Sequence, residues 1–240
     1  TRPNRESHNQ FVRSRAVNFL AITRATLAKD MRLEWRSKDA INAMLFFSLL
    51  VVVIFSFAFD PTMAVSRRIA GGILWVALLF AAVTALNQTW ARELRHQVLD
   101  AQRMAPSPAS ALFLAKVLGN FIFVSVIEIV IGPLFVVFYN LHALGQGWLM
   151  ALVLPLGTLA LVVNGTFFAA LSLRTRNREM LLPLILFPIT VPALLAMVQS
   201  TTGILTGEFD PGLWVRLLGG YDLIFLTLCL LLFETILGAE

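Results

Sequence analysis

Long apolar segments alternate with short polar ones from about residue 41 to the end of the chain. Each apolar segment is close to the ~20 residues with which a helix crosses a bilayer. The six segments cover residues 41–59, 69–86, 112–139, 148–173, 180–198 and 222–237. Since no polar insertion is large enough to fold by itself, the pattern predicts an all-α, polytopic membrane protein with a single domain over residues 13–240.

A helix is also predicted over residues 13–36, because apolar side chains recur on one side of it. That side carries Val17, Leu20, Ala21, Leu27, Ala28, Met31 and Trp35, with Arg24 among them, and Lys29, Arg32 and Arg36 lie toward the other side. We expect this amphipathic helix to lie on an anionic membrane surface. Residues 1–12 have little apolar content and are expected to be disordered. Residues 1–40 also lack the short apolar core and cleavage site of a secretory signal.

The composition supports a membrane protein and argues against two other classes. Only 14% of the residues are charged, whereas soluble chains have roughly 25%, so lipid must cover much of the apolar surface. The net charge of +5 does not indicate a nucleic-acid partner, because the basic residues lie between apolar segments instead of in one patch. The lone Cys229 can form neither an internal disulfide nor a CxxC motif.

The distribution of basic residues predicts the orientation. Nine Lys and Arg precede the first span, four lie between spans two and three, and three lie between spans four and five. One side of the membrane thus receives 16 of the 19 basic residues and the other side 3. Since basic loops remain in the cytoplasm, both termini are expected to be cytoplasmic and the number of spans even.

The cytoplasmic loop 89–111 contains a second amphipathic pattern, a helix over about residues 91–105 that Pro106 and Pro108 end. We interpret this helix as a docking surface, although a solvated loop is the alternative. The candidate docking residues are Trp90, Arg92, Glu93, Leu94, Arg95, Val98, Leu99 and Asp100.

No motif lets this chain act alone as an enzyme. It has no GxxxxGK[ST] phosphate loop, no HExxH, no GxSxG and no CxxCH. The sequence therefore predicts no catalytic residue, no metal site and no covalently bound cofactor, and any energy input must come from a partner. His142, in the outer loop 140–147, could ligate haem iron; a surface histidine near the headgroups is the alternative.

Two polar residues lie inside predicted spans, Glu128 in the third and Asn164 in the fourth. An ionised carboxylate inside a span costs ~2.5–3.5 kcal/mol on insertion scales, so Glu128 should face protein or water, or be protonated. It could contact a translocated group or act at a subunit interface. Alternatively, it is a neutral side chain hydrogen-bonded to a neighbouring span, through Asn164 or Thr166.

The stretch between spans five and six, residues 199–221, is rich in glycine. We expect an outer loop here that returns to the membrane interface as short helices. Trp214 would then lie near the depth of the headgroups.

Five stretches together resemble the CcmB family, the membrane subunits of the cytochrome c maturation ABC transporter. They are GGILWVALLFAAVTALN (71–87), WARELRHQVLDAQRMAPSPASALFLAK (90–116), VIEIVIGPLF (126–135), RNREMLLPLILFPITVPALLA (176–196) and WVRLLGGYDLIFLTLCLLLFE (214–234). The likeness covers nearly everything from about residue 20 onward. The cytoplasmic loop departs from the family pattern at Gln97, Asp100 and Gln102-Arg103.

The resemblance implies a permease of ABC-2-type architecture in the bacterial cytoplasmic (inner) membrane. It implies pairing with a CcmA-like ATPase, association with CcmC- and CcmD-like membrane proteins, release of a haem-loaded CcmE-like chaperone, and two copies per complex. Haem would then be a transported or handled ligand. Two rival hypotheses are a non-transporting scaffold that tethers the ATPase to haem-handling subunits, and an intramembrane enzyme that uses Glu128.

Overall fold

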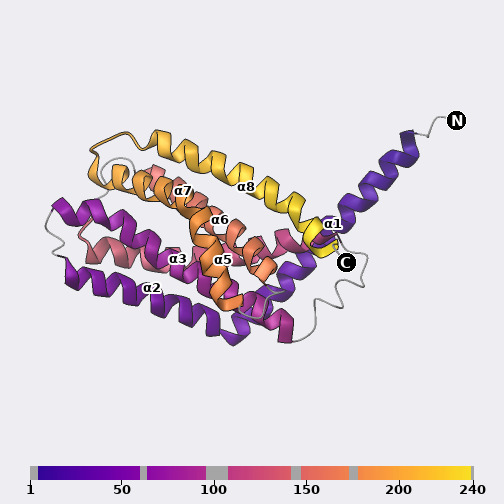
Figure 1. The fold of residues 1–240 in the computed structure, drawn as a ribbon, viewed down its shortest axis with the longest axis horizontal. Helices are drawn as coiled ribbons and strands as arrows, with labels where there is room; N and C mark the ends of the chain where they lie inside the picture. Colours follow the sequence, from indigo (N-terminus) through magenta and orange to yellow (C-terminus); the bar gives the residue numbers. More distant parts are fainter. Residues whose placement is uncertain (1–4, 60–63, 96–107, 142–146, 173–177, 239–240) are drawn as a thin grey trace.

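The computed structural model describes residues 5–59, 64–95, 108–141, 147–172 and 178–238, and all regular structure in these residues is helical (Figure 1). The helices are α1 (Arg5–Ser37), α2 (Asp39–Ala58), α3 (Ala64–Arg95), α5 (Ala109–Phe138), α6 (Gly147–Ser172), α7 (Arg178–Thr206) and α8 (Gly212–Gly238). Every helix except α1 contains a stretch long and apolar enough to cross a membrane. The prediction of an all-α protein with six such helices is therefore confirmed.

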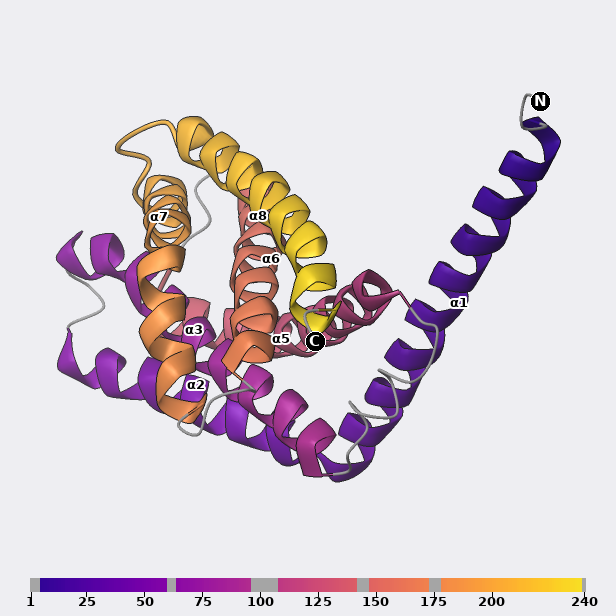
Figure 2. The same cartoon turned by 45° about the vertical axis from the view of Figure 1, so that its right-hand side comes forward.

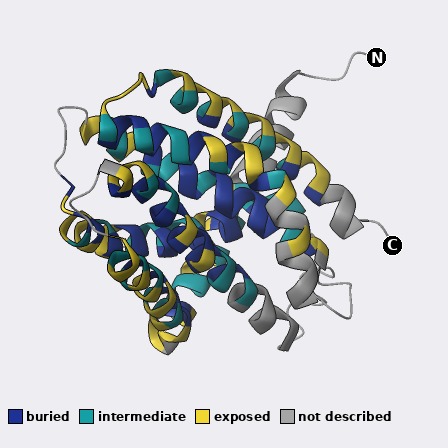
Figure 3. Cartoon of the chain, turned by 60° about the vertical axis from the view of Figure 1, so that its left-hand side comes forward, coloured by how far each residue is buried: buried dark blue, intermediate teal, exposed yellow. Residues whose placement is uncertain are grey.

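The membrane helices surround a central pair, α3 and α6, which pack against each other. Helices α5 and α7 each contact both members of this pair, α2 covers α3 and α5, and α8 covers α5, α6 and α7. Figure 3 shows buried residues where helices face one another and exposed residues on the outer sides. The exposed side chains of α2 and α8 include many large apolar ones, which is the surface expected where lipid is the solvent.

A close approach of α3 and α6 depends on Gly157. The Trp75 ring of α3 is fully buried against this glycine, and a Cβ atom there would overlap the ring. Small residues at helix interfaces let membrane helices pack closely, since van der Waals contact drives their association. Gly157 therefore determines how near the two central helices can lie.

Helix α1 begins at Arg5. The expectation that residues 1–12 are disordered is therefore wrong from residue 5 onward. Residues 5–37 contain neither Gly nor Pro, so nothing in the sequence stops the helix from extending toward the N-terminus. Lys38, with φ 58°, is the single residue between α1 and α2, and its left-handed conformation turns the chain sharply. As a result, α1 packs on α5 with its C-terminal part and projects away from the bundle with its N-terminal part (Figures 1 and 2).

The expectation of an outer loop over residues 199–221 is wrong. Helix α7 continues to Thr206 and α8 begins at Gly212, so residues 207–211 alone connect them. Gly207, with φ 68°, ends α7 in the left-handed conformation that glycine adopts without strain. Asp210 Oδ1 accepts the Gly212 N–H at 2.9 Å and starts α8 as an N-cap.

The predicted fifth span, residues 180–198, lies within α7, and the predicted sixth span, residues 222–237, lies within α8. Gly203, Gly219 and Gly220, which indicated a loop, lie inside continuous helices, because packing in a bundle overrides the weak helix propensity of single residues.

Candidate functional site

The first part of the predicted docking helix is the end of α3. The backbone of Trp90, Arg92, Glu93, Leu94 and Arg95 belongs to this helix, which runs without a break from Ala64. Residues 73–95 contain neither Gly nor Pro, so the helix of the second span continues beyond its apolar part. Val98, Leu99 and Asp100 lie outside the described residues, as do the rest of this loop up to residue 107 and the haem-ligand candidate His142.

Glu128 lies on α5 and is 8% exposed, and the Thr158 hydroxyl of α6 donates a hydrogen bond to its Oε1. The hypothesis of a bond to a neighbouring span is therefore confirmed, but the partners suggested for it, Asn164 and Thr166, are wrong. Each of these two side chains bonds elsewhere. A carboxyl group that accepts a hydroxyl hydrogen bond inside the protein avoids contact with lipid, which reduces the cost of burying it.

A second polar contact joins the same two helices. Asn120 Nδ2 of α5 lies 3.3 Å from Thr166 Oγ1 of α6. The two pairs are eight residues apart on each helix and run in opposite directions along the chain. Their spacing therefore agrees with one antiparallel register of α5 and α6, about 12 Å apart along the helix axis at ~1.5 Å per residue.

Asn164 belongs to a separate polar cluster that joins α6, α7 and α8. Its Nδ2 donates to the Tyr221 hydroxyl at 2.6 Å, and that hydroxyl donates to the Ile189 carbonyl oxygen of α7 at 3.0 Å. The sequence analysis placed Tyr221 at the end of an outer loop, so this role was missed. The predicted sixth span began at residue 222, and Tyr221 therefore fell one residue outside it.

Asp222 lies next to this cluster on α8 and was also missed. It is 5% exposed, and neither of its carboxyl oxygens, nor Asn164 Oδ1, accepts a hydrogen bond within the described part of the chain. A buried polar group without a partner lowers stability, and a carboxyl group inside a membrane span marks a candidate functional residue for that reason. Asp222 therefore joins Glu128 and Asn164 as an intramembrane polar candidate.

Polar contacts also connect α3 to α7. The Trp75 indole Nε1 donates to Thr201 Oγ1 at 2.9 Å in the buried centre of the interface. Toward the end of the bundle that carries the α7–α8 connection, Arg68 pairs with Glu208, with an Nη2–Oε1 distance of 2.7 Å. The exposed Arg68–Glu208 ion pair adds little to stability by itself, so the buried Trp75–Thr201 hydrogen bond is the stronger link.

At the opposite end of the bundle, α1 is bound to α5 by an ion pair. Lys116 is 4% exposed and its Nζ lies 2.7 Å from Asp30 Oδ2. The Thr23 hydroxyl also lies 3.3 Å from the Ala111 carbonyl oxygen. Removing one partner of a buried pair leaves an uncompensated charge, so the pair holds α1 in place even if its net contribution to stability is small.

The buried contacts between side chains join the helices of the bundle to one another. Trp75–Thr201, Asn120–Thr166 and Glu128–Thr158 each link two helices, and Asn164 with Tyr221 links three. Among the side chains that the structure describes, no three His, Cys, Asp or Glu come together to hold a metal ion.

The Glu128–Thr158 bond can be measured by a double-mutant cycle. We expect Thr158→Val to lower the free energy of unfolding by about 1 kcal/mol, within the range of interhelical hydrogen bonds in membranes. In a chain that already carries Glu128→Leu, the same change should have almost no effect, because the acceptor is gone. Unfolding of the purified protein in mixed micelles measures both. Equal effects of Thr158→Val in the two backgrounds would contradict the bond, and Thr227→Val, at an exposed position whose hydroxyl bonds only to its own helix, is the control.

The chain is similar in sequence to one protein family and to several named proteins. The family described as CcmB protein matches residues 21–236. Heme exporter protein B of Rhodobacter capsulatus is 37% identical over 172 residues, which cover 72% of this chain and 78% of the relative. Heme exporter protein B of Paracoccus denitrificans is 31% identical over 172 residues, with the same coverage. Heme exporter protein B of Bradyrhizobium diazoefficiens is 28% identical over 205 residues, 85% of this chain and 91% of the relative.

Proposed function

This chain belongs to the CcmB protein family, and from that premise we propose that it is the transmembrane permease subunit of an ABC transporter complex for cytochrome c maturation. Family membership carries the proposal, and six helices able to cross a membrane support it. Its relatives share the name Heme exporter protein B. In this role haem is the group that the complex exports, or releases on a loaded chaperone, and it is not a resident cofactor of the chain.

A partner ATPase supplies the energy, since the chain has no nucleotide-binding motif. The continuity of α3 supports a route for coupling, because its last turns carry the docking residues from Trp90 to Arg95 while its middle packs against α2, α5, α6 and α7. Closure of a CcmA-like ATPase dimer would push on this end of α3. A continuous helix transmits such a push to its packed neighbours as a rigid-body shift.

The orientation and the partners follow from the same proposal. The chain lies in the bacterial inner membrane with both termini in the cytoplasm, which the excess of 16 basic residues over 3 supports. CcmC- and CcmD-like membrane proteins and a CcmE-like haem chaperone complete the complex. Because ABC ATPases act as dimers, two copies of the chain are present.

Complementation tests the proposed function. We expect the chain to restore c-type cytochromes in a Rhodobacter capsulatus strain that lacks its own Heme exporter protein B, because 37% identity extends over most of both chains. Haem staining of membrane proteins after electrophoresis measures the result, and the Paracoccus denitrificans relative serves as the positive control. A chain that is inserted and co-isolates with the ATPase, but restores no holocytochrome, would refute the proposal.

A second candidate is a scaffold that tethers the ATPase to haem-handling subunits without moving haem itself. The observation in its favour is that Glu128, Asn120 and Trp75 all bond to other helices of the same chain. A scaffold needs such bonds only for stability, so conservative changes that keep the complex assembled should keep maturation. Loss of holocytochrome in an assembled Glu128→Gln complex would favour transport instead.

A further inference from the structure

The buried polar atoms that lack a hydrogen-bond partner are gathered in one part of the bundle. Among the residues that the structure describes, three buried side-chain oxygens accept no hydrogen bond: Asp222 Oδ1, Asp222 Oδ2 and Asn164 Oδ1. Asp222 is 5% exposed and Asn164 is fully buried. They lie on neighbouring helices, since Asn164 of α6 bonds to Tyr221, the residue before Asp222 on α8. Random packing faults would be scattered, whereas these oxygens mark one place that is short of hydrogen-bond donors.

The hydroxyl group next to Asp222 in the chain has no proton to spare for it. The Tyr221 hydroxyl donates to the Ile189 carbonyl oxygen at 3.0 Å and accepts from Asn164 Nδ2 at 2.6 Å. A hydroxyl group has a single proton to donate, so the Tyr221 hydroxyl cannot also donate to Asp222. An ionised carboxylate can only accept hydrogen bonds, and within the described part of the chain it would find none here.

The helices packed against this part of α8 also supply no neutralising cation from their sequences. These helices are α5, α6 and α7. Helix α6 contains no ionisable residue, and in α7 the ionisable residues are its first two, Arg178 and Glu179. They precede Ile189, the residue of α7 that bonds to Tyr221, by at least ten positions, or about 15 Å along the helix axis. Neither helix therefore places a positive charge at the depth of this contact.

The ionisable residues of α5 are engaged elsewhere. Lys116 pairs with Asp30 of α1, and Glu128 accepts a hydrogen bond from Thr158 of α6. The other ionisable residues of α8 itself are Tyr221, Cys229, Glu234 and the exposed Arg216. Within the described residues, no cation thus pairs with the carboxyl group of Asp222.

Asp222 lies at the middle of the apolar stretch of α8. The stretch Gly212–Phe233 extends ten residues before it and eleven after it, so each end is about 15 Å away along the helix axis. An ionised carboxylate at the centre of a span costs ~2.5–3.5 kcal/mol on insertion scales, and pairing or protonation removes that cost. Since no described residue pairs with it, a bound proton is what allows this carboxyl group to be buried here.

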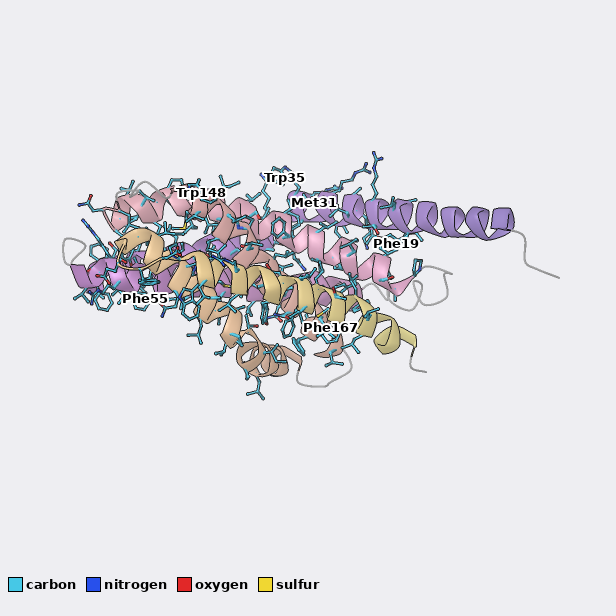
Figure 4. The ribbon with its side chains drawn as sticks, turned by 90° about the horizontal axis from the view of Figure 1, so that it is seen from above. Phe19, Met31, Trp35, Phe55, Trp148 and Phe167 are labelled. Atoms are coloured by element: carbon cyan, nitrogen blue, oxygen red, sulfur yellow. The ribbon has the colours of Figure 1, made fainter. Side chains whose placement is uncertain are left out.

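Helix α8 is the least embedded of the six membrane helices. Only 17% of its apolar stretch is buried, against 61% for α3 and 56% for α6. It lies along the outside of the bundle, at the top in Figure 1 and nearest to the viewer in Figure 4. The buried residues of the stretch form one stripe toward the bundle: Leu218, Asp222, Cys229 and Phe233. Moving α8 outward would therefore uncover Asp222 with little loss of packed surface.

We propose that Asp222 is a proton-binding site whose occupation is linked to the packing of α8 against α6 and α7. With the proton bound, the carboxyl group is neutral and the buried stripe stays closed. When the proton leaves to water, the carboxylate has no partner in the bundle, so the state in which α8 has moved outward is favoured. The two states differ by one proton, and a rise of one pH unit therefore shifts their ratio toward the open state by up to ~10-fold.

Cys229 reports on this movement, because it is the single cysteine of the chain and lies 4% exposed on the same stripe. The purified chain in detergent is treated with an uncharged maleimide at a series of pH values, and mass spectrometry measures the labelling rate. A thiol reacts faster as the pH rises, so each rate is divided by that of Asp222→Asn, which cannot lose a proton. We expect a ratio near one at low pH and an increase of up to ~10-fold per pH unit once Asp222 ionises.

Infrared spectroscopy detects the proton directly, because a protonated carboxyl group and a carboxylate have separate carbonyl bands. We expect the wild-type chain at neutral pH to show a protonated-carboxyl band that Asp222→Asn lacks. In the wild-type chain this band should disappear over the pH range in which the labelling of Cys229 increases. Glu128→Gln is the matched control, since it removes the other buried carboxyl group of the described spans and should leave the pH dependence of labelling unchanged.

Three results would overturn the proposal. They are a labelling ratio that does not change with pH, a protonated-carboxyl band that Asp222→Asn retains in full, and loss of the pH dependence in Glu128→Gln. If Asp222→Asn does not fold, the absence of a protonated-carboxyl band from the wild-type chain at neutral pH would overturn it equally. Both measurements use the chain alone, so their outcome is independent of its proposed role in cytochrome c maturation.

Discussion

Arg92→Glu combined with Leu94→Asp is expected to abolish cytochrome c maturation while the chain remains inserted in the membrane. Both positions lie in the last turn of α3, beyond the stretch Val65–Asn87 that is apolar enough to cross the membrane. Insertion therefore does not depend on them. The double change reverses one charge and replaces one apolar residue on the surface proposed to meet the ATPase. Like charges that face each other at an interface, or a carboxylate buried there, cost several kcal/mol of binding free energy.

Two measurements separate docking from assembly in this variant. Haem staining of membranes reports maturation, and co-isolation of the ATPase with the tagged chain reports docking. A matched control places the same kinds of change at the other end of the same helix, Val65→Asp with Arg67→Glu, where both side chains are exposed. Since these positions belong to the first residues of the apolar stretch, insertion of the control is verified before its maturation is compared. Normal maturation in the Arg92/Leu94 variant would contradict docking at this end of α3, and an equal loss in the control would show that charge on α3 in general is harmful.

Gly157→Leu is expected to prevent the native packing of the two central helices. A Cβ atom alone at this position would overlap the Trp75 ring, and a leucine side chain needs far more space. Trp75 cannot withdraw easily, because it is fully buried and its Nε1 bonds to Thr201 of α7 at 2.9 Å. Overpacking of a core commonly costs ~1–3 kcal/mol. Here we expect the upper end of that range for Gly157→Ala, and loss of the folded bundle for Gly157→Leu.

Thermal unfolding in detergent and elution as a single species measure this result. Gly219→Leu is the control, since a Cβ atom at Gly219 meets nothing within 4 Å and the added side chain would face outward from α8. A second change also tests the cause: Trp75→Ala should partly restore the Gly157→Leu chain by making room for leucine. A stable Gly157→Leu protein, or no rescue by Trp75→Ala, would contradict the overlap as the reason for the defect.

The polar contacts inside the bundle illustrate how far the sequence predicts the site. It identified Glu128 and Asn164 as intramembrane polar residues, because polarity inside an apolar run is visible along the chain. Their partners, Thr158 and Tyr221, depend on the antiparallel register of α5 and α6 and on the position of α8. Register is a property of two helices together, so no single segment contains it. Asp222 was missed for a related reason, since glycines before it indicated a loop.

The sequence by itself determined that this protein is all-helical, that six of its helices are long and apolar enough to cross a membrane, and to which family it belongs. Hydropathy is a local property, and a helix in lipid must satisfy its own backbone hydrogen bonds, so each span is decided within its own residues. Only the tertiary structure decided which helices are central, how Gly157 admits Trp75, and which side chains Glu128 and Asn164 bond. These features arise from contacts between segments far apart in the chain, and the packing of the helices determines those contacts.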